Sequence, residues 1–369
     1  MKSITFECET ITPMFLAGAD GRTPELRPPS LKGLMRFWWR AMNGNLPLEK
    51  LKKKEAEIFG ASDENIGRSK ISIRIARQLS SVDITESLWQ EIPYKEKTSY
   101  KSGKKYKVPT EYKEISYLLY STHMLNERPY IKAGSSFSII ISSRDQQSLK
   151  EAVHSFALLV FFGALGTRNR RGAGSFKVND VVYSGNEDYK NLFCTSEIQS
   201  REQLKDYIES KLKVFIGPTS NRSYSTLKNS KIYIFNPENN WKDALKTIGK
   251  PFLDFRKENK ERITDTPNFG FPIQHRSSKT LMGGGPKNTK KDKKGNVIDF
   301  LERRTSPLIF KLIKTSKDCY FPVIIWLNGE LIPSDYNLMD KKGINSAPPN
   351  EQIITDFLKT IPDKLGAIL

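Results

Sequence analysis

Alternation of apolar and polar residues predicts four strands in the first half of the chain. In KISIRIARQ, residues 70–78, the side chains of Ile71, Ile73 and Ile75 share one face and polar residues lie between them. This period of two is the pattern of a half-buried strand. The remaining strands of this half are expected at residues 3–11, 136–142 and 175–184.

Helical segments are predicted in the first and last of the three intervals between these strands. Residues 31–43 form one helix, which a second helix at 48–60 continues, and residues 146–165 form a more apolar one. The order strand–helix–strand–strand–helix–strand is the ferredoxin-like arrangement. A long insertion separates its second and third strands.

The second half repeats this order more loosely. Strands are expected at 231–236, 306–314 and 320–327, with a helix at 241–263 that is interrupted at Pro251 and a last helix at about 350–363. Asn328 and Gly329 form a hairpin-turn signal after the third of these strands. A fourth strand is weak at best, so the second ferredoxin-like unit is expected to be degenerate.

These elements predict an α+β protein with two tandem ferredoxin-like domains. The polar, non-periodic stretch at 184–198 indicates a linker. We therefore expect a first domain at 1–185 and a second at 199–369.

The charge of the chain points to a polyanionic partner. Sixty Lys and Arg against 41 Asp and Glu give a net charge of +19 over 369 residues, which favours nucleic acid. A membrane is not expected, because the most apolar run, residues 155–166, is too short to span a bilayer. The start of the chain also alternates like a strand and does not resemble a signal peptide.

Cysteine and histidine positions argue against a metal or cofactor site. The three cysteines and three histidines are scattered and form no CxxC pair, so neither a disulfide framework nor a structural zinc site is expected. We predict no cofactor and no metal, and a cytoplasmic location.

A basic stripe runs along the helix at 31–43. Ser30 is expected to cap it, and Lys32, Arg36 and Arg40 are four residues apart, so they share one face. Because a helix N-terminus also favours anions, the stripe predicts nucleic-acid binding. The alternative is an ordinary amphipathic helix with a solvated basic side.

The loop GALGTRNRRGAGSF, residues 163–176, combines flexible backbone with positive charge. It contains neither a Walker sequence nor a GxGxxG turn between strand and helix, which argues against a nucleotide cofactor. Arginine and glycine together suit the phosphodiester of a single strand, although an ordinary helix-to-strand turn is the competing interpretation. The candidate RNA-binding residues of this loop are Gly166, Arg168, Arg170, Arg171, Gly172 and Gly174.

Two insertions are rich in lysine. Residues 94–113 carry seven lysines together with Tyr94, Tyr100, Tyr106 and Tyr112, which are six residues apart. An extended ribbon would place these four rings on one side, where bases could stack, unless the segment is a variable hairpin and the spacing is chance. Residues 283–296 are low in complexity and would add only diffuse positive charge.

Three segments resemble a known family. Residues 11–41, ITPMFLAGADGRTPELRPPSLKGLMRFWWRA, are similar to the opening signature of one RAMP-superfamily subunit of the type III-B (Cmr) CRISPR effector complex. Residues 163–176 resemble the glycine-rich loop of RAMP proteins. RRTSPLIFKLI at 303–313, with FPVIIWLNG after it, is similar to the second-domain strand pair of that subunit.

The resemblance implies two RRM-type ferredoxin-like domains and a non-catalytic subunit at the crRNA 3′ end that helps to capture target RNA. Its implied partners are crRNA, single-stranded target RNA and other Cmr subunits, especially a neighbouring RAMP subunit. Since no RNP1-type aromatic segment is present in the chain, binding is expected along the helix and loop and not over the sheet.

The competing class is an endoribonuclease. Some RAMP relatives cut RNA with a histidine and others with an aspartate after the first strand. His123, after a predicted strand at 116–122, and Asp20 are the candidates here. General acid–base cleavage needs a proton acceptor near the 2′-hydroxyl, and the sequence places neither side chain near the arginines.

Overall fold

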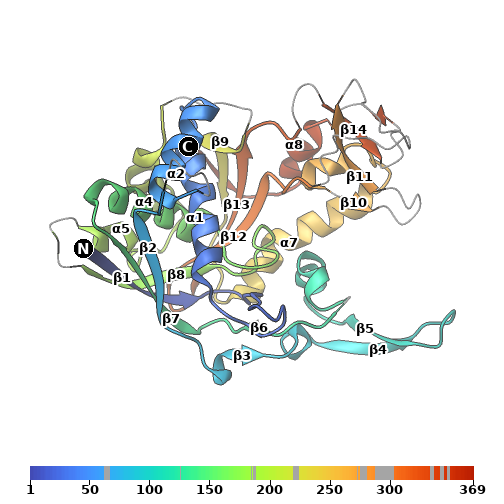
Figure 1. Cartoon of the computed structure of the whole chain (residues 1–369). Coiled ribbons are helices and arrows are strands. Elements are labelled where there is room, and N and C mark those ends of the chain that lie inside the picture. Colours follow the sequence, from blue (N-terminus) through green and yellow to red (C-terminus); the bar gives the residue numbers. More distant parts are fainter. Residues whose placement is uncertain are drawn as a thin grey trace.

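Two four-stranded antiparallel sheets form the framework of the molecule (Figure 1). The computed structural model describes residues 1–61, 67–124, 126–183, 185, 188–218, 224–271, 273–274, 281–286, 303–332, 336–340, 345–346 and 350–369. No helix in these residues is long and apolar enough to cross a membrane. Most of the lysine-rich stretch at 283–296, from residue 287 on, lies outside the described residues.

The first sheet has the strand order β2-β7-β1-β8, which is the ferredoxin-like order. Its elements are β1 (Lys2–Thr10), α1 (Pro28–Met42), β2 (Ile71–Arg77), β7 (Ser136–Ser143), α4 (Gln146–Phe162) and β8 (Phe176–Tyr183). The helix α2 (Leu48–Phe59) follows α1 as a separate helix.

Helices α1 and α4 pack against each other and cover one face of this sheet. Phe6 on β1 contacts Phe156 on α4, with ring centroids 4.6 Å apart. Trp38 and Trp39 of α1 are both buried. The Trp39 indole donates to the Glu151 carboxylate at 2.7 Å, so this ring is a core side chain and no stacking surface.

The second sheet has the order β12-β13-β9-β16 and repeats the same topology. Its elements are β9 (Thr226–Ile234), α7 (Trp241–Glu258), β12 (Leu308–Ser316), β13 (Cys319–Asn328), α8 (Gln352–Lys359) and β16 (Leu365–Ile368). The weak fourth strand is thus present but only four residues long. The predicted α+β fold of two ferredoxin-like units is confirmed.

The two strands β12 and β13 of the second sheet are buried on both faces, which explains why they read as continuous apolar runs. Phe310 and Ile324 face α7 and α8, in a cluster with Phe252. Ile309 and Ile325 belong instead to the core of the first unit, where α1 and α4 contact β9 and β12. The helices of the first unit therefore cover the other face of the second sheet.

Two local predictions for the second half were wrong, and the predicted linker contains a short helix. Pro251 lies inside α7, which continues through it. β13 ends at Asn328, but its partners are β12 and β9, so no hairpin follows Gly329. Residues 184–198 contain α5 (Tyr189–Phe193), whose Phe193 packs on Phe6 with ring centroids 5.4 Å apart.

The insertion between β2 and β7 forms a separate lobe at the lower edge of the view (Figure 1). It contains β3 (Ile84–Thr85), β4 (Tyr94–Thr98), β5 (Lys105–Pro109), α3 (Lys113–Leu118) and β6 (Tyr130–Ile131). The predicted strand at 116–122 is wrong, because these residues end α3 and form a 3₁₀ turn. Outside this lobe lie α6 (Arg201–Tyr207) and the small sheet of β10 (Ile273–Gln274), β11 (Leu281–Pro286), β14 (Tyr336–Asp340) and β15 (Asn345–Ser346).

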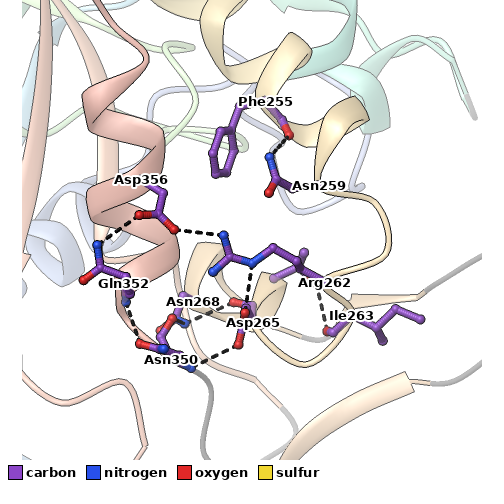
Figure 2. Close-up of polar contacts among 10 residues, drawn as sticks. Phe255, Asn259, Arg262, Ile263, Asp265, Asn268, Asn350, Gln352 and Asp356 are labelled. Carbon is purple, nitrogen blue, oxygen red and sulfur yellow. Dashed lines mark hydrogen bonds and ion pairs between the residues drawn. The ribbon is translucent and has the colours of Figure 1, made fainter.

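An arginine joins the end of α7 to α8 (Figure 2). The Arg262 guanidinium contacts Asp265 at 3.0 Å and Asp356 on α8 at 2.9 Å. Asn268 donates to the Asn350 carbonyl at 2.8 Å. These bonds hold α8 in position before the chain enters β16.

A buried lysine lies between the two units. Lys311 is on the face of β12 that faces the first unit, and its Nζ donates to the Gly163 carbonyl at the end of α4, at 2.6 Å. Burial lowers the pKa of Lys311 to about 7. The ammonium at a helix C-terminus is favoured by the helix dipole, yet its loss of water penalises the charge.

We expect the stability of the protein to rise with pH because of this lysine. Between a folded pKa of about 7 and an ordinary value of 10.5, the unfolded chain binds the proton and the folded chain does not. The free energy of unfolding then increases by up to about 1.4 kcal/mol per pH unit in that window. Lys311→Met should lack this gain when unfolding is measured by urea titration from about pH 7 to about pH 10.

The exposed Lys317→Met is the matched control, and it should keep the pH dependence of the wild type. Parallel curves for the wild type and Lys311→Met would contradict the buried, proton-releasing state of Lys311.

Candidate nucleic-acid interface

The glycine-rich loop packs against the segment that follows β1. Thr167 donates its backbone N–H to the Phe15 carbonyl at 2.8 Å, and Gly174 donates to the Pro13 carbonyl at 2.9 Å. Gly166 and Gly174 have φ of +84° and +69°. A Cβ at either position would overlap the Phe15 or the Leu165 carbonyl oxygen, so these glycines permit close backbone approach.

Arg171 connects this loop to the second unit. Its guanidinium donates to three backbone carbonyls, those of Arg170 at 3.0 Å, Leu308 at 3.0 Å and Phe269 at 2.7 Å. It also lies 5.3 Å from the ring centroids of both Phe252 and Phe310. Burial lowers the pKa of Arg171 to about 9, and the neighbouring Arg168 adds to the shift, so the group stays charged at neutral pH.

Arg170 is held in a similar way on the other side of the loop. Its guanidinium donates to the Ser306 carbonyl and lies 4.9 Å from the centroid of Phe37 on α1. Burial, with a smaller contribution from Arg304, lowers the pKa of Arg170 to about 10. Arg170 therefore brings the loop, α1 and the second unit together.

Arg168 is the loop arginine with the fewest bonds. It has a φ of +61° and is half-buried, and its Nε donates to the Ser121 hydroxyl at 2.8 Å. Among the described residues its two terminal nitrogens have no hydrogen-bond partner. Gly172, in contrast, is buried, and a Cβ there would overlap the Leu245 side chain.

The basic stripe of α1 lies against α2. Arg36 and Arg40 both bond the buried Glu55 carboxylate, at 2.5 and 2.6 Å. Lys32 is half-buried with no ion pair in the described structure, and burial next to Arg36 lowers its pKa. The helix begins at Pro28, and no side chain caps it, so the predicted Ser30 cap is wrong because two prolines without N–H groups occupy the first turn.

An open groove of about 790 Å³ lies beside the glycine-rich loop. Its walls come from the segment after β1, from β3, from the segment before β6 and from the loop itself. The charged residues that line it are Arg22, Glu86, Glu127 and Arg128. Glu127 is neutralised by Lys107 at 2.6 Å, while neither arginine side chain has an anionic partner in the part of the chain that the structure describes.

Sequence patterns did not single out these two groove arginines. Arg22 lies in the Pro-rich loop after the first strand, where no periodicity marks it. Arg128 lies over a hundred residues further on, and only the fold brings it to the same groove.

Neither candidate catalytic residue is arranged for proton transfer. The Asp20 carboxylate accepts bonds from the Thr23 hydroxyl and from the backbone N–H groups of Arg22 and Thr23, which lower its pKa. His123 is buried, with Nε2 2.8 Å from the Ser116 hydroxyl and Nδ1 3.1 Å from the Leu119 carbonyl. Burial lowers the pKa of His123 to about 4. Within the described ranges, no group of His, Cys, Asp and Glu could hold a metal ion.

The tyrosine-rich insertion forms a hairpin of β4 and β5. Tyr94 and Tyr106 lie on different strands, and Tyr94 pairs with Pro109 while Tyr106 pairs with Lys97. Alternation along each strand therefore places these two rings on opposite faces. The single row of tyrosines is wrong and the alternative, a hairpin, is confirmed, because the turn at 99–104 reverses the chain.

Comparison with known proteins gives a consistent set of relatives. Residues 7–177 match the RAMP superfamily. The chain is 30% identical over 287 residues to CRISPR system Cmr subunit Cmr1-1 of Pyrococcus furiosus, covering 72% of this chain and 76% of that protein. It is 34% identical over 198 residues to Cmr1-2 of the same organism, covering 48% of this chain and 96% of that protein.

Solved structures share the fold. The crystal structure of Cmr1 from Pyrococcus furiosus matches with a TM-score of 0.63 and 24% identity over 99% of this chain and 98% of that one. A chain in the cryo-EM structure of type III-B Cmr-beta bound to cognate target RNA matches with a TM-score of 0.56 and 16% identity over 98% of each chain. These matches support the two-unit architecture.

The bonds of Arg171 predict a structural role for this side chain. Arg171→Ala should lower the free energy of unfolding by about 3 kcal/mol or more, because three carbonyls lose a charged donor in a half-buried site. Arg168→Ala, which removes one bond to a hydroxyl, should lower it by only about 1 kcal/mol. Urea unfolding monitored by circular dichroism measures both, and equal losses would contradict the assignment.

Proposed function

This chain belongs to the RAMP superfamily and to the Cmr subunits of type III-B CRISPR complexes, and we propose that it is a cytoplasmic, non-catalytic subunit that binds single-stranded RNA. We place it at the crRNA 3′ end, beside a neighbouring RAMP subunit, where it helps to capture target RNA. Its partners are crRNA, target RNA and the other Cmr subunits.

The groove beside the glycine-rich loop carries the RNA-binding part of the proposal. Arg22 and Arg128 line it without an anionic partner among the described residues, and Arg168 of the adjoining loop has two nitrogens without a bond. Guanidinium groups of this kind bind phosphate oxygens. Glu86 is the one wall carboxylate without a cation in the described part, so the balance of the groove is positive.

The glycine-rich loop supports the groove in this proposal: Thr167 lines the groove wall, and Arg168 is the next residue along the loop. Arg170 and Arg171 have their donors directed to carbonyls of the second unit. Of the α1 stripe, Lys32 is the side chain with no ion pair among the described residues, whereas Arg36 and Arg40 both bond Glu55. We therefore propose Arg22, Arg128, Arg168 and Lys32 as the phosphate contacts.

The open face of the first sheet is a poor site for RNA. Glu7 and Glu9 alternate with the buried residues of β1, on the face that α1 and α4 leave uncovered. An RRM sheet stacks bases on aromatic rings at such positions. Here the positions hold carboxylates, and that of Glu9 is already paired with Lys314 at 2.6 Å and Lys177 at 3.9 Å. The lack of aromatic rings at these positions favours binding at the groove.

The proposed position at the crRNA 3′ end rests on the resemblance of one sequence segment. The opening signature at 11–41, which the subunit at that end shares, includes Arg22 of the groove wall.

We expect Arg22→Ala/Arg128→Ala to weaken binding of a labelled single-stranded RNA and to reduce its salt dependence. The slope of log K against log salt should fall by about 1.4, or ~0.7 for each phosphate that the variant no longer binds. The measurement is a fluorescence-anisotropy titration at several salt concentrations.

Lys50→Ala/Lys54→Ala on the exposed side of α2 removes the same charge far from the groove and is the matched control. An equal slope change in this control would mean that overall charge, and not the groove, binds RNA.

The second prediction concerns catalysis. Asp20→Asn and His123→Gln should leave RNA cleavage by the assembled Cmr complex within about twofold of the wild-type rate, because a general acid or base contributes ~100-fold or more. Asp83→Asn, which alters another aspartate that closes a local turn through Ser80, controls for structural effects. Loss of cleavage in either variant, with RNA binding and thermal stability preserved, would establish the endoribonuclease alternative.

A further inference from the structure

The hairpin of β4 and β5 projects from the lobe between β2 and β7 (Figure 1). All five residues of β4 are exposed, and the tip at 99–104 carries the fully exposed Tyr100. No residue of this hairpin lines the proposed groove, so the groove does not explain why the hairpin is present. Its two faces differ in charge and in contacts.

The inner face of the hairpin is attached to the body and is electrically balanced. Lys107 forms an ion pair with Glu127 at 2.6 Å, and its Nζ lies 4.9 Å from the centroid of Tyr94. Tyr94 packs against Trp89, with ring centroids 5.2 Å apart. On the same face, Lys105 contacts Glu96 at 3.4 Å. This face therefore anchors the arm.

The outer face has positive charge without a counterion. The pairing register places Lys95, Lys97, Tyr106 and Val108 together on it. Both lysines are exposed, and in the described residues neither has an ion pair or hydrogen bond. Tyr106 is 48% exposed, and its ring contacts no other ring among the described side chains. A half-exposed aromatic ring thus lies among unneutralised cations.

The register sets the distances on this face. Lys97 lies directly across from Tyr106, and side chains in that relation are separated by about 5 Å at Cβ. Lys95 is two residues along β4, which is about 7 Å. A ring flanked by two ammonium groups at this spacing suits a base with its neighbouring phosphates, since every base has a stacking face and the backbone is anionic.

We propose that the outer face of this hairpin is a second contact for single-stranded RNA, in which Tyr106 stacks on an unpaired base and Lys95 and Lys97 bind the adjacent phosphates. This inference rests on the proposed function, because it assumes that the subunit engages RNA. The two sites lie on connected elements, since Glu127 lines the groove and also anchors the hairpin through Lys107. The same strand of RNA then runs from the groove along the arm.

An acidic protein surface is the other occupant that the charge would suit. An acidic protein would form ion pairs with Lys95 and Lys97 but would gain little binding free energy from the Tyr106 ring. Stacking of a base therefore distinguishes the two, and Tyr106 is the residue that tests it.

The test compares variants of the full chain in binding of a labelled oligouridine and of an RNA duplex of the same length. Tyr106→Ala should weaken oligouridine binding at least about five-fold without changing the salt slope, and Tyr106→Phe should restore it. Lys95→Ala/Lys97→Ala should lower the slope by about 1.4. Duplex binding should be unaffected by Tyr106→Ala, because its bases are already stacked.

Lys105→Ala is the matched control, since this lysine is on the inner face and already paired with Glu96. Normal oligouridine binding by Tyr106→Ala, with weakened binding by Arg22→Ala/Arg128→Ala, would overturn the hairpin site and leave the proposed function intact. If Lys95→Ala/Lys97→Ala weakens oligouridine binding and Tyr106→Ala does not, the stacking site is also overturned, and the hairpin is a general cationic surface. Failure of the wild type to bind oligouridine would instead refute the proposed function.

Discussion

The structure depends on how the glycine-rich loop joins its two ferredoxin-like units. The loop leaves the end of α4, contacts the segment after β1 through Gly166 and Gly174, and then inserts Arg171 among carbonyls of the second unit. Lys311 on β12 makes a second contact between the two units, because it donates to the Gly163 carbonyl at the end of α4. Buried cations here are satisfied by backbone oxygens and not by carboxylates, so removing either partner would leave an uncompensated buried group.

This junction also determines where the groove lies. Thr167 pairs with Phe15, and the chain that continues from Phe15 forms one wall of the groove and carries Arg22. The opposite wall is held by the lobe between β2 and β7. The loop therefore helps to position a side chain outside the loop, that of Arg22, because its backbone bonds hold the segment after β1 in place.

The periodicity of the sequence predicts a larger part of the fold than of the candidate site. Alternation predicts β1, β2 and β8, because each of these strands has one more deeply buried face. The continuous apolar run predicts α4, because residues 155–162 of that helix are buried on all sides. β12 and β13 are buried on both faces, so their sequences identify strands but not their partners, and the turn signal at Asn328 pointed to the wrong hairpin. The site depends on how distant segments come together, as in the bond of Arg171 to Leu308 or the placement of Arg22 and Arg128 in one groove, and no local pattern encodes this.

The chemistry of the two basic side chains explains why a motif rich in arginine is not by itself a phosphate site. The planar guanidinium has several donors and is weakly hydrated, so it can satisfy carbonyls inside a junction, as Arg170 and Arg171 do. The lysine ammonium is strongly hydrated and usually remains at the surface, as on β4 and the outer side of α2. Part of the net charge of +19 thus stabilises the interior. In the proposed function, contact with RNA therefore falls to the exposed cations and to those arginines whose nitrogens have no other acceptor.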